Sequence, residues 1–129
     1  MKGTLSVKEY SLGEIANNSL NAELKLILYD ALSKQIPQYG NIQLKESEEA
    51  KDTLSVEIKD YHRKEDAYDA AGNILSYRYS LSIDYIASNK RFSVNAVKSF
   101  NSSLGEAECK DSISYESVKQ FIDKLRGDF

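Results

Sequence analysis

The sequence is poor in the residue types that carry most enzyme chemistry. Its 129 residues include one histidine, one cysteine, one proline, one methionine and no tryptophan. The single cysteine, Cys109, excludes an intramolecular disulfide and a thiolate metal cluster, and the single histidine, His62, excludes a multi-histidine metal site. No apolar run is long enough for the core of a signal peptide or for the roughly 20 residues of a membrane helix. We therefore expect a protein that is not an enzyme, without a catalytic group, a metal or a cofactor.

What the chain does have is the composition of a globular domain. Hydrophobic residues make up 41% and charged residues 29%, which is enough apolar surface for a core. With 17 Lys and Arg against 20 Asp and Glu, the net charge is −3, so we expect no nucleic-acid partner held by a global positive field. The length predicts one domain over residues 1–129. The N-terminal residues fit either a cytosolic protein or a mature domain trimmed of an export signal.

Alternation of apolar and polar residues predicts the strands. The clearest run has six large side chains at consecutive odd positions: Leu75, Tyr77, Tyr79, Leu81, Ile83 and Tyr85. Turns between strands are predicted at Gly72-Asn73 and, as a hairpin, at 87–90, and the polar stretch at 45–52 is predicted as a loop. The other predicted strands cover 4–12 (ending at Gly13), 41–44, 53–61 and about 92–100.

Two segments have helical rather than strand periodicity. Apolar residues from Leu20 to Leu32 recur at helical spacing, after possible N-cap residues at 17–19 and before Pro37. A second helix is predicted from about Asp111, which could cap it, to Gly127. Each helix has one apolar stripe, so each needs a sheet face to cover. We predict an α+β two-layer sandwich, with two helices on one face of a mixed sheet of about four strands and the other face open or partnered.

Neither His62 nor Cys109 lies in a motif that supplies a complete catalytic group. His62 has no recognisable nucleophile near it, so we interpret it as a solvated loop residue. Lys110 could lower the pKa of Cys109, but no histidine partner is near in sequence, and we predict a small, partly buried side chain. The adjacent acids at 48–49 and 65–66 are typical of a wet surface.

Tyrosines and a few basic residues are the remaining candidates for binding. Tyr77, Tyr79 and Tyr85 share the apolar face of one strand, where core packing is the simplest role, but a partner surface or an amphiphilic ligand also fits. Four basic residues lie toward the ends of the predicted strands, and they would form an anion site only if the fold brings them together: Lys90, Arg91, Lys98 and Lys110.

Several segments resemble one known family. These are Gly72-Asn73-Ile74-Leu75-Ser76-Tyr77-Arg78-Tyr79-Ser80-Leu81-Ser82-Ile83-Asp84-Tyr85, then Lys98-Ser99-Phe100, then Ala107-Glu108-Cys109-Lys110-Asp111. With the helix and the strand that precede them, they are similar to the lipopolysaccharide-assembly lipoproteins of the LptE family, over nearly the whole chain. The resemblance implies two helices against one face of a mixed four-stranded sheet. It also implies a periplasmic domain, lipid-anchored to the outer membrane, that plugs the LptD β-barrel and helps to insert lipopolysaccharide.

The resemblance also implies a binding role for particular residues. A family lysine in the loop before the last helix contacts the glycolipid and matches Lys110, and a basic position ahead of a Ser-Phe pair matches Lys98, whereas a second basic position falls on Ala70. With Lys90 and Arg91 of the hairpin, these lysines form the predicted lipopolysaccharide-binding set. No lipid-bearing cysteine lies near Met1, so we expect the signal and the membrane anchor to precede this segment.

A different class of function stays open beside this one. The domain could be a periplasmic interaction module that regulates a cell-wall enzyme or serves a transport complex, with no glycolipid site. Both hypotheses agree with the poverty in catalytic residue types.

Overall fold

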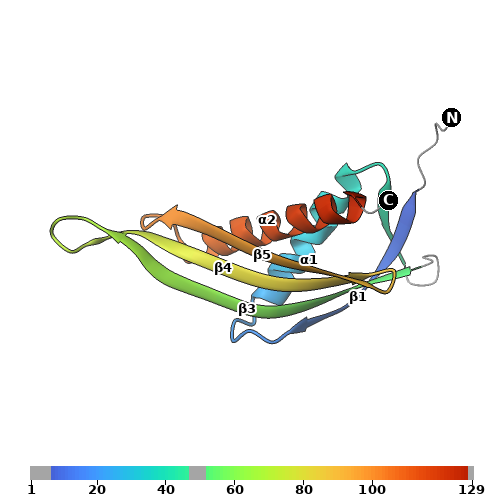
Figure 1. Cartoon of the computed structure of the whole chain (residues 1–129), viewed down its shortest axis with the longest axis horizontal. Coiled ribbons are helices and arrows are strands. Elements are labelled where there is room, and N and C mark those ends of the chain that lie inside the picture. The colour runs from blue at the N-terminus through green and yellow to red at the C-terminus, as the bar shows by residue number, and fades with distance from the viewer. Residues whose placement is uncertain (1–6, 47–51, 128–129) are drawn as a thin grey trace.

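Two helices cover one face of a five-stranded sheet in the computed structural model, which describes residues 7–46 and 52–127 (Figure 1). The sheet order is β2-β1-β3-β4-β5, in which β1 pairs parallel with β2 and β3, and β3, β4 and β5 are antiparallel. The elements along the chain are β1 (Lys8–Asn17), α1 (Leu24–Gln35), the 3-10 turn η1 (Ile36–Gln38), β2 (Ile42–Lys45), β3 (Asp52–Tyr68), β4 (Ile74–Ala87), β5 (Lys90–Asn101) and α2 (Glu106–Gly127).

The predicted α+β sandwich with helices on one face is confirmed, but the sheet has five strands rather than about four. The short β2, predicted as a strand at 41–44, is the fifth member: it follows the crossover through α1 and pairs with the outer edge of β1. A strand joined to a parallel neighbour needs such a crossover, and a helix of this length is the usual one. The polar run predicted as a loop at 45–52 has its middle, 47–51, outside the described residues.

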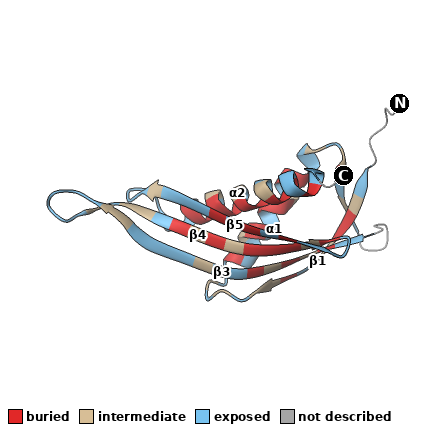
Figure 2. Ribbon diagram, viewed as in Figure 1, coloured by how far each residue is buried: buried red, intermediate tan, exposed pale blue. Residues whose placement is uncertain are grey.

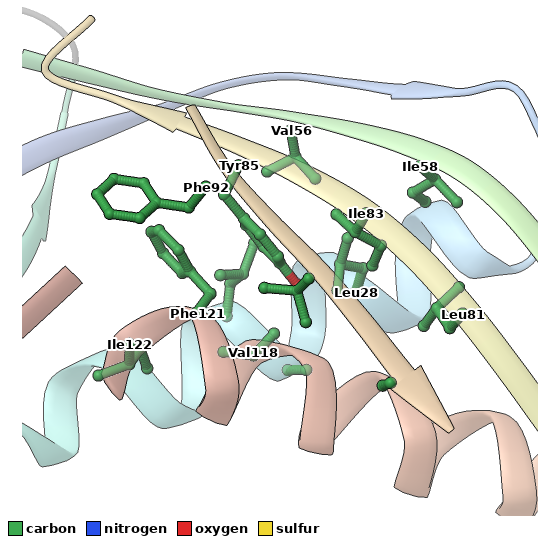
Figure 3. Close-up of a cluster of buried hydrophobic side chains, with 14 of the residues drawn as sticks. Leu28, Val56, Ile58, Leu81, Ile83, Tyr85, Phe92, Val118, Phe121 and Ile122 are labelled. Carbon is green, nitrogen blue, oxygen red and sulfur yellow. The ribbon is translucent and has the colours of Figure 1, made fainter. Parts of the chain in front are cut away.

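The core lies between the helices and β3, β4 and β5 (Figures 2 and 3). The Tyr85 ring stacks on Phe121 with centroids 4.3 Å apart, and Phe92 meets Phe121 edge-on at 5.8 Å. Tyr85 and Tyr79 are both buried, so the predicted packing role is confirmed for these two, while Tyr77 is half-buried. Burying one large apolar side chain stabilises the fold by about 1.5–3 kcal/mol, so this aromatic stack anchors α2 to the sheet.

Both helices begin at residues other than those predicted. α1 starts at Leu24, and Leu20 is fully exposed, because Asn17 and Ser19 fold the preceding residues into a turn: Asn17 Oδ1 accepts hydrogen bonds from the Ser19 amide and hydroxyl. α2 starts at Glu106, five residues before the predicted start at Asp111, and its first bond runs from the Cys109 amide to the Gly105 carbonyl. The acidic Glu106 and Glu108 suit the positive end of the helix dipole.

The strands depart from the prediction in length and in phase. β1 continues past Gly13 through an irregularity between Leu12 and Ile15. β3 runs to Tyr68, so His62 lies in a strand rather than a loop, exposed and bonded to Asp60 at 2.7 Å. The β3–β4 hairpin therefore extends beyond both helices (Figure 1).

The hairpin turns are as predicted. Ser88 and Asn89 have φ of 54° and 62°, the left-handed pair that a tight turn between β4 and β5 requires. Gly72, at the tip of the β3–β4 hairpin, has φ of 87°. Asp69 holds that tip by accepting hydrogen bonds from the Ala71 and Asn73 amides at 2.9 Å.

Candidate functional site

The structure does not bring the four predicted basic residues into one site. Lys90 and Arg91 are the first residues of β5, and Lys98 lies eight residues after Lys90, roughly 26 Å along an extended strand. Lys90 and Arg91 point to opposite faces, because side chains alternate along a strand. Lys90 Nζ lies 5.9 Å from the centre of the Phe92 ring, on the helix side, while Arg91 bonds Asp84 on the other face.

Lys110 lies in the first turns of α2 rather than in a preceding loop, which corrects the sequence prediction. Its side chain is 8% exposed, and its ammonium contacts Glu23 at 3.0 Å and Glu106 at 3.8 Å. The same ammonium lies 5.9 Å from the centre of the Tyr61 ring. A buried cation needs such carboxylate partners, so Lys110 links the start of α1 and of α2 to the sheet.

Lys98 lies over an acidic groove between β5 and α2. Its ammonium is 3.5 Å from the Ser112 hydroxyl and 5.4 Å from the centre of the Phe100 ring. The groove has a volume of about 410 Å³ and is lined by Lys98, Glu108, Asp111, Ser112, Tyr115 and Glu116. Lys110 and Ser112 are two residues apart, about 200° around a helix, so Lys98 and Lys110 contact different sides of α2.

A set of aromatic and basic side chains gathers on the helix side of the sheet, near the first turn of α2. The strand register places Arg63, Tyr79 and Lys98 in one cross-strand row and Glu65, Tyr77 and Phe100 in the next. Arg63 Cζ lies 4.4 Å from the Tyr77 ring centre, and the Tyr79 ring meets Phe100 edge-on at 5.4 Å. We call this the aromatic–basic cluster: Tyr61, Arg63, Tyr77, Tyr79, Lys98, Phe100 and Lys110.

The sequence prediction missed Tyr61 and Arg63 because of one irregularity in β3. Strict alternation from Leu54, Val56 and Ile58 would turn both side chains away from the helices. The register shifts between Ile58 and Asp60, and Tyr61 then pairs with Leu81 and faces inward. A bulge of this kind re-aims the side chains that follow it, and no residue type in the segment signals it.

Glu106 is the acidic centre of the cluster. Its Oε2 accepts a hydrogen bond from the Tyr61 hydroxyl at 3.1 Å, its Oε1 lies 3.6 Å from Arg63 Nη1, and Oε2 is 3.8 Å from Lys110 Nζ. Partial burial, and then the bond to Glu106, raise the pKa of Tyr61 well above the ordinary tyrosine value. The hydroxyl therefore stays a proton donor at neutral pH.

The sheet face opposite the helices combines small polar side chains with several ion pairs, and Asp84 has the most partners among its charged groups. Asp84 accepts a 2.6 Å bond from Arg91 and a 2.8 Å bond from the Ser93 hydroxyl, and Lys59 lies 3.8 Å away. Burial alone would raise the pKa of Asp84, but these partners outweigh it and hold the pKa below its ordinary value. The other small polar residues of this face are Ser55, Ser80, Ser82, Asn95 and Ser99.

The described residues show little else that points to chemistry. Cys109 is fully buried in α2, further inside than predicted. Among residues 7–46 and 52–127, no group of three or more His, Cys, Asp or Glu side chains could hold a metal ion. Neither helix in this part of the chain is long and apolar enough to cross a membrane.

The fold recurs in solved bacterial lipoproteins. Lipoprotein GNA1162 from Neisseria meningitidis aligns over 90% of this chain and 99% of its own, at 9% identity and a TM-score of 0.52. The PelC dodecamer from Paraburkholderia phytofirmans aligns over 92% of both chains, at 13% identity and a TM-score of 0.55. Rare lipoprotein B from Shewanella oneidensis aligns over 90% and 96%, at 10% identity and a TM-score of 0.48. At these identities the likeness concerns the fold alone.

The comparisons by sequence give no relatives. No protein-family model matches the chain, and no curated protein matches it. Bacterial lipoproteins are thus among the proteins that share this architecture, and neither the LptE family nor a partnership with LptD follows from the likeness.

Proposed function

We propose that the chain is the globular domain of an outer-membrane lipoprotein of the LptE type, which docks into the LptD barrel from the periplasmic side and binds lipopolysaccharide during its insertion. In this proposal the protein is a scaffold and not an enzyme, and the full-length protein is held at the membrane by an N-terminal lipid anchor. The observation that carries it is the arrangement of the sheet, with both helices on one face and the other face bare.

The bare face supports docking against a protein wall. Apart from Ile86 and the exposed Val97, its side chains are polar or charged, so this surface can meet the polar interior of a barrel while burying few large apolar groups. The central charge, Asp84, is already paired with Arg91 and Ser93, so covering this face would leave no uncompensated carboxylate at its centre.

The aromatic–basic cluster supports the glycolipid part of the proposal. A lipid that carries phosphates beside acyl chains needs cations next to an apolar surface, and Arg63 and Lys98 lie beside the half-buried rings of Tyr77 and Phe100. Lys110 belongs to the same cluster. Lys90 and Arg91, at the other end of β5, are proposed to contact lipopolysaccharide separately.

Two measurements test this function. The tagged full-length protein should recover LptD from detergent-solubilised outer membranes, and recovery of a different partner without LptD would contradict the proposal. Lipopolysaccharide binding should weaken at least tenfold in Lys98→Glu combined with Arg63→Gln. Substitution of Lys110 by Glu is a poorer test, because it would place a third carboxylate beside Glu23 and Glu106 and destabilise the fold.

A periplasmic interaction module, which regulates a cell-wall enzyme or serves a transport complex, is the second candidate. It is favoured by the carboxylate neighbours of the predicted cations: Lys110 is paired with Glu23, Arg91 with Asp84, and Lys98 borders an acidic groove. The likeness to PelC, solved as a dodecamer, adds self-assembly to this candidate. Unchanged lipopolysaccharide binding in Lys98→Glu/Arg63→Gln, together with a partner other than LptD, would establish it.

A further inference from the structure

Three proton donors from two elements converge on the carboxylate of Glu106. The Tyr61 hydroxyl and the Arg63 guanidinium come from β3, and the Lys110 ammonium comes from α2. We call these three groups the anion cradle. Lys110 is more than nine-tenths buried, and its ammonium donates a hydrogen bond to Glu23 at 3.0 Å and lies 3.8 Å from Glu106, so the cradle is part of the packed structure and not a chance meeting of surface chains.

The carboxylate fills this cradle incompletely. Only the Tyr61 hydroxyl is at ordinary hydrogen-bond distance, 3.1 Å, while the two cations are 3.6 and 3.8 Å from the nearest carboxylate oxygen. Charge-assisted bonds in a filled site are closer to about 2.7–2.9 Å. Three donors that stand apart around two oxygens suit a larger anion with three oxygens, which is the shape of a phosphate group.

Glu106 can also leave without unfolding the domain. Its side chain is 42% exposed and lies in the first turn of a 22-residue helix, so it can turn toward solvent while the later turns of the helix stay packed. Lys110 would keep its shorter contact to Glu23, at 3.0 Å, so its buried charge would remain compensated.

We infer that Glu106 is an internal stand-in for a phosphate group, and that the anion cradle of Tyr61, Arg63 and Lys110 binds phosphate-bearing ligands when Glu106 swings out. The rings of Tyr77 and Tyr61 beside the two cations make the rim apolar, which suits a phosphate attached to an organic group. This inference rests on the proposed function only for the identity of the ligand, because a free phosphate and a lipid phosphate share the recognised chemistry.

The test compares two acids of the same helical turn. Glu106→Ala should bind inorganic phosphate at least tenfold more tightly than the wild-type chain, as measured by calorimetry and by NMR shifts of the Tyr61 and Arg63 amides. Glu108→Ala is the matched control, since it removes the same charge from the acidic groove beside Lys98 and leaves the anion cradle filled. Equal affinities in the two variants would overturn the inference.

A second variant and a second probe complete the experiment. Arg63→Ala in the Glu106→Ala background should abolish the gain in phosphate affinity. Retention of the full gain would overturn the assignment of the anion cradle. If the Glu106→Ala variant binds vesicles of phosphatidic acid but not vesicles of phosphatidylcholine, the ligand is a lipid phosphate. If it binds inorganic phosphate and neither kind of vesicle, the ligand is a free anion. Failure to recover LptD would contradict the proposed function but would not affect the gain in phosphate affinity, so the proposed function and this inference can fail separately.

Discussion

The hydroxyl pair between Tyr85 and Ser117 shows how single polar atoms are accommodated in this core. Both residues are fully buried, and their hydroxyls are 2.8 Å apart, so this hydrogen bond joins β4 to α2. Tyr85 lies among aliphatic and aromatic neighbours, and burial raises the pKa of its phenol above the ordinary value. The pair thus stays neutral and positions α2 along the strand.

Removing one hydroxyl of this pair should cost stability. We expect Tyr85→Phe to lower the free energy of unfolding in urea by about 1–2 kcal/mol, because the buried Ser117 hydroxyl loses its partner while the ring stack on Phe121 is kept. Tyr85→Phe combined with Ser117→Ala should cost less than the sum of the two single variants. Strictly additive losses would show that the two hydroxyls do not interact.

Asp84 predicts an acid-sensitive contribution to stability. Its pKa is lower in the folded state than its ordinary value, so its stabilisation is complete above the ordinary aspartate pKa of about 3.9 and is lost as the pH falls through the folded-state pKa. Unfolding in urea at about pH 6 and about pH 3 should show a smaller acid-induced loss in Asp84→Asn than in the wild-type chain. An equal loss in both would assign the acid sensitivity to other carboxylates.

At the scale of elements, the predicted boundaries of α2 and β3 are wrong for one physical cause. Periodicity reports which side chains are buried, and it is silent on where backbone hydrogen bonding starts. The exposed first turn of α2 therefore escaped the sequence prediction, since residues 106–108 bury no apolar side chain, and so did the distal half of β3 beyond the helices. The Ile58/Asp60 bulge was missed for another reason, because no residue type in the segment signals a change of phase, and the inward placement of Tyr61 and Arg63 was missed with it.

At Gly13, β1 passes too close to β3 to leave room for a side chain. A Cβ at this position would lie 2.8 Å from Thr53 Cγ2 and 3.4 Å from the Leu54 carbonyl oxygen, whereas a Cβ at Gly40 would meet nothing within 4 Å. We expect Gly13→Ala to lower the free energy of unfolding by about 1–3 kcal/mol, and we expect Gly40→Ala to leave it nearly unchanged. Thr53→Ala should restore part of the loss in the Gly13→Ala background, and no recovery would place the strain in the backbone instead.

At the scale of the whole molecule, the two faces of the sheet differ: one is covered by the helices and the other is bare. The helix face contains the core, and the opposite face is left to solvent or to a partner (Figure 2). An antiparallel sheet with one solvated face is stable as such, so the polar face needs no cover for folding. Its availability for docking follows from the layer arrangement and not from any single residue.

A bulky residue on the bare face should separate docking from stability. Ser82 lies at the centre of this face, and its hydroxyl donates a 3.1 Å hydrogen bond to Asn95 Oδ1. Ser82→Trp should abolish recovery of LptD while changing the unfolding free energy by less than about 1 kcal/mol. Lys119→Trp, on the exposed side of α2, is the control and should leave recovery unchanged. Normal recovery with Ser82→Trp would place the docking surface elsewhere.

The sequence by itself determined the α+β class, the two amphipathic helices, the central strands and the two hairpin turns. These follow from local periodicity and from turn residues such as Asn89 and Gly72, whose backbone preferences need no distant partner. Tertiary structure alone decided the strand order, the burial of Lys110 and the meeting of Tyr61, Arg63 and Glu106, because each depends on contacts between residues far apart in the chain. From the scarcity of histidine and cysteine the sequence predicted little catalytic chemistry, and packing placed the cations of the predicted binding set beside carboxylates or aromatic rings.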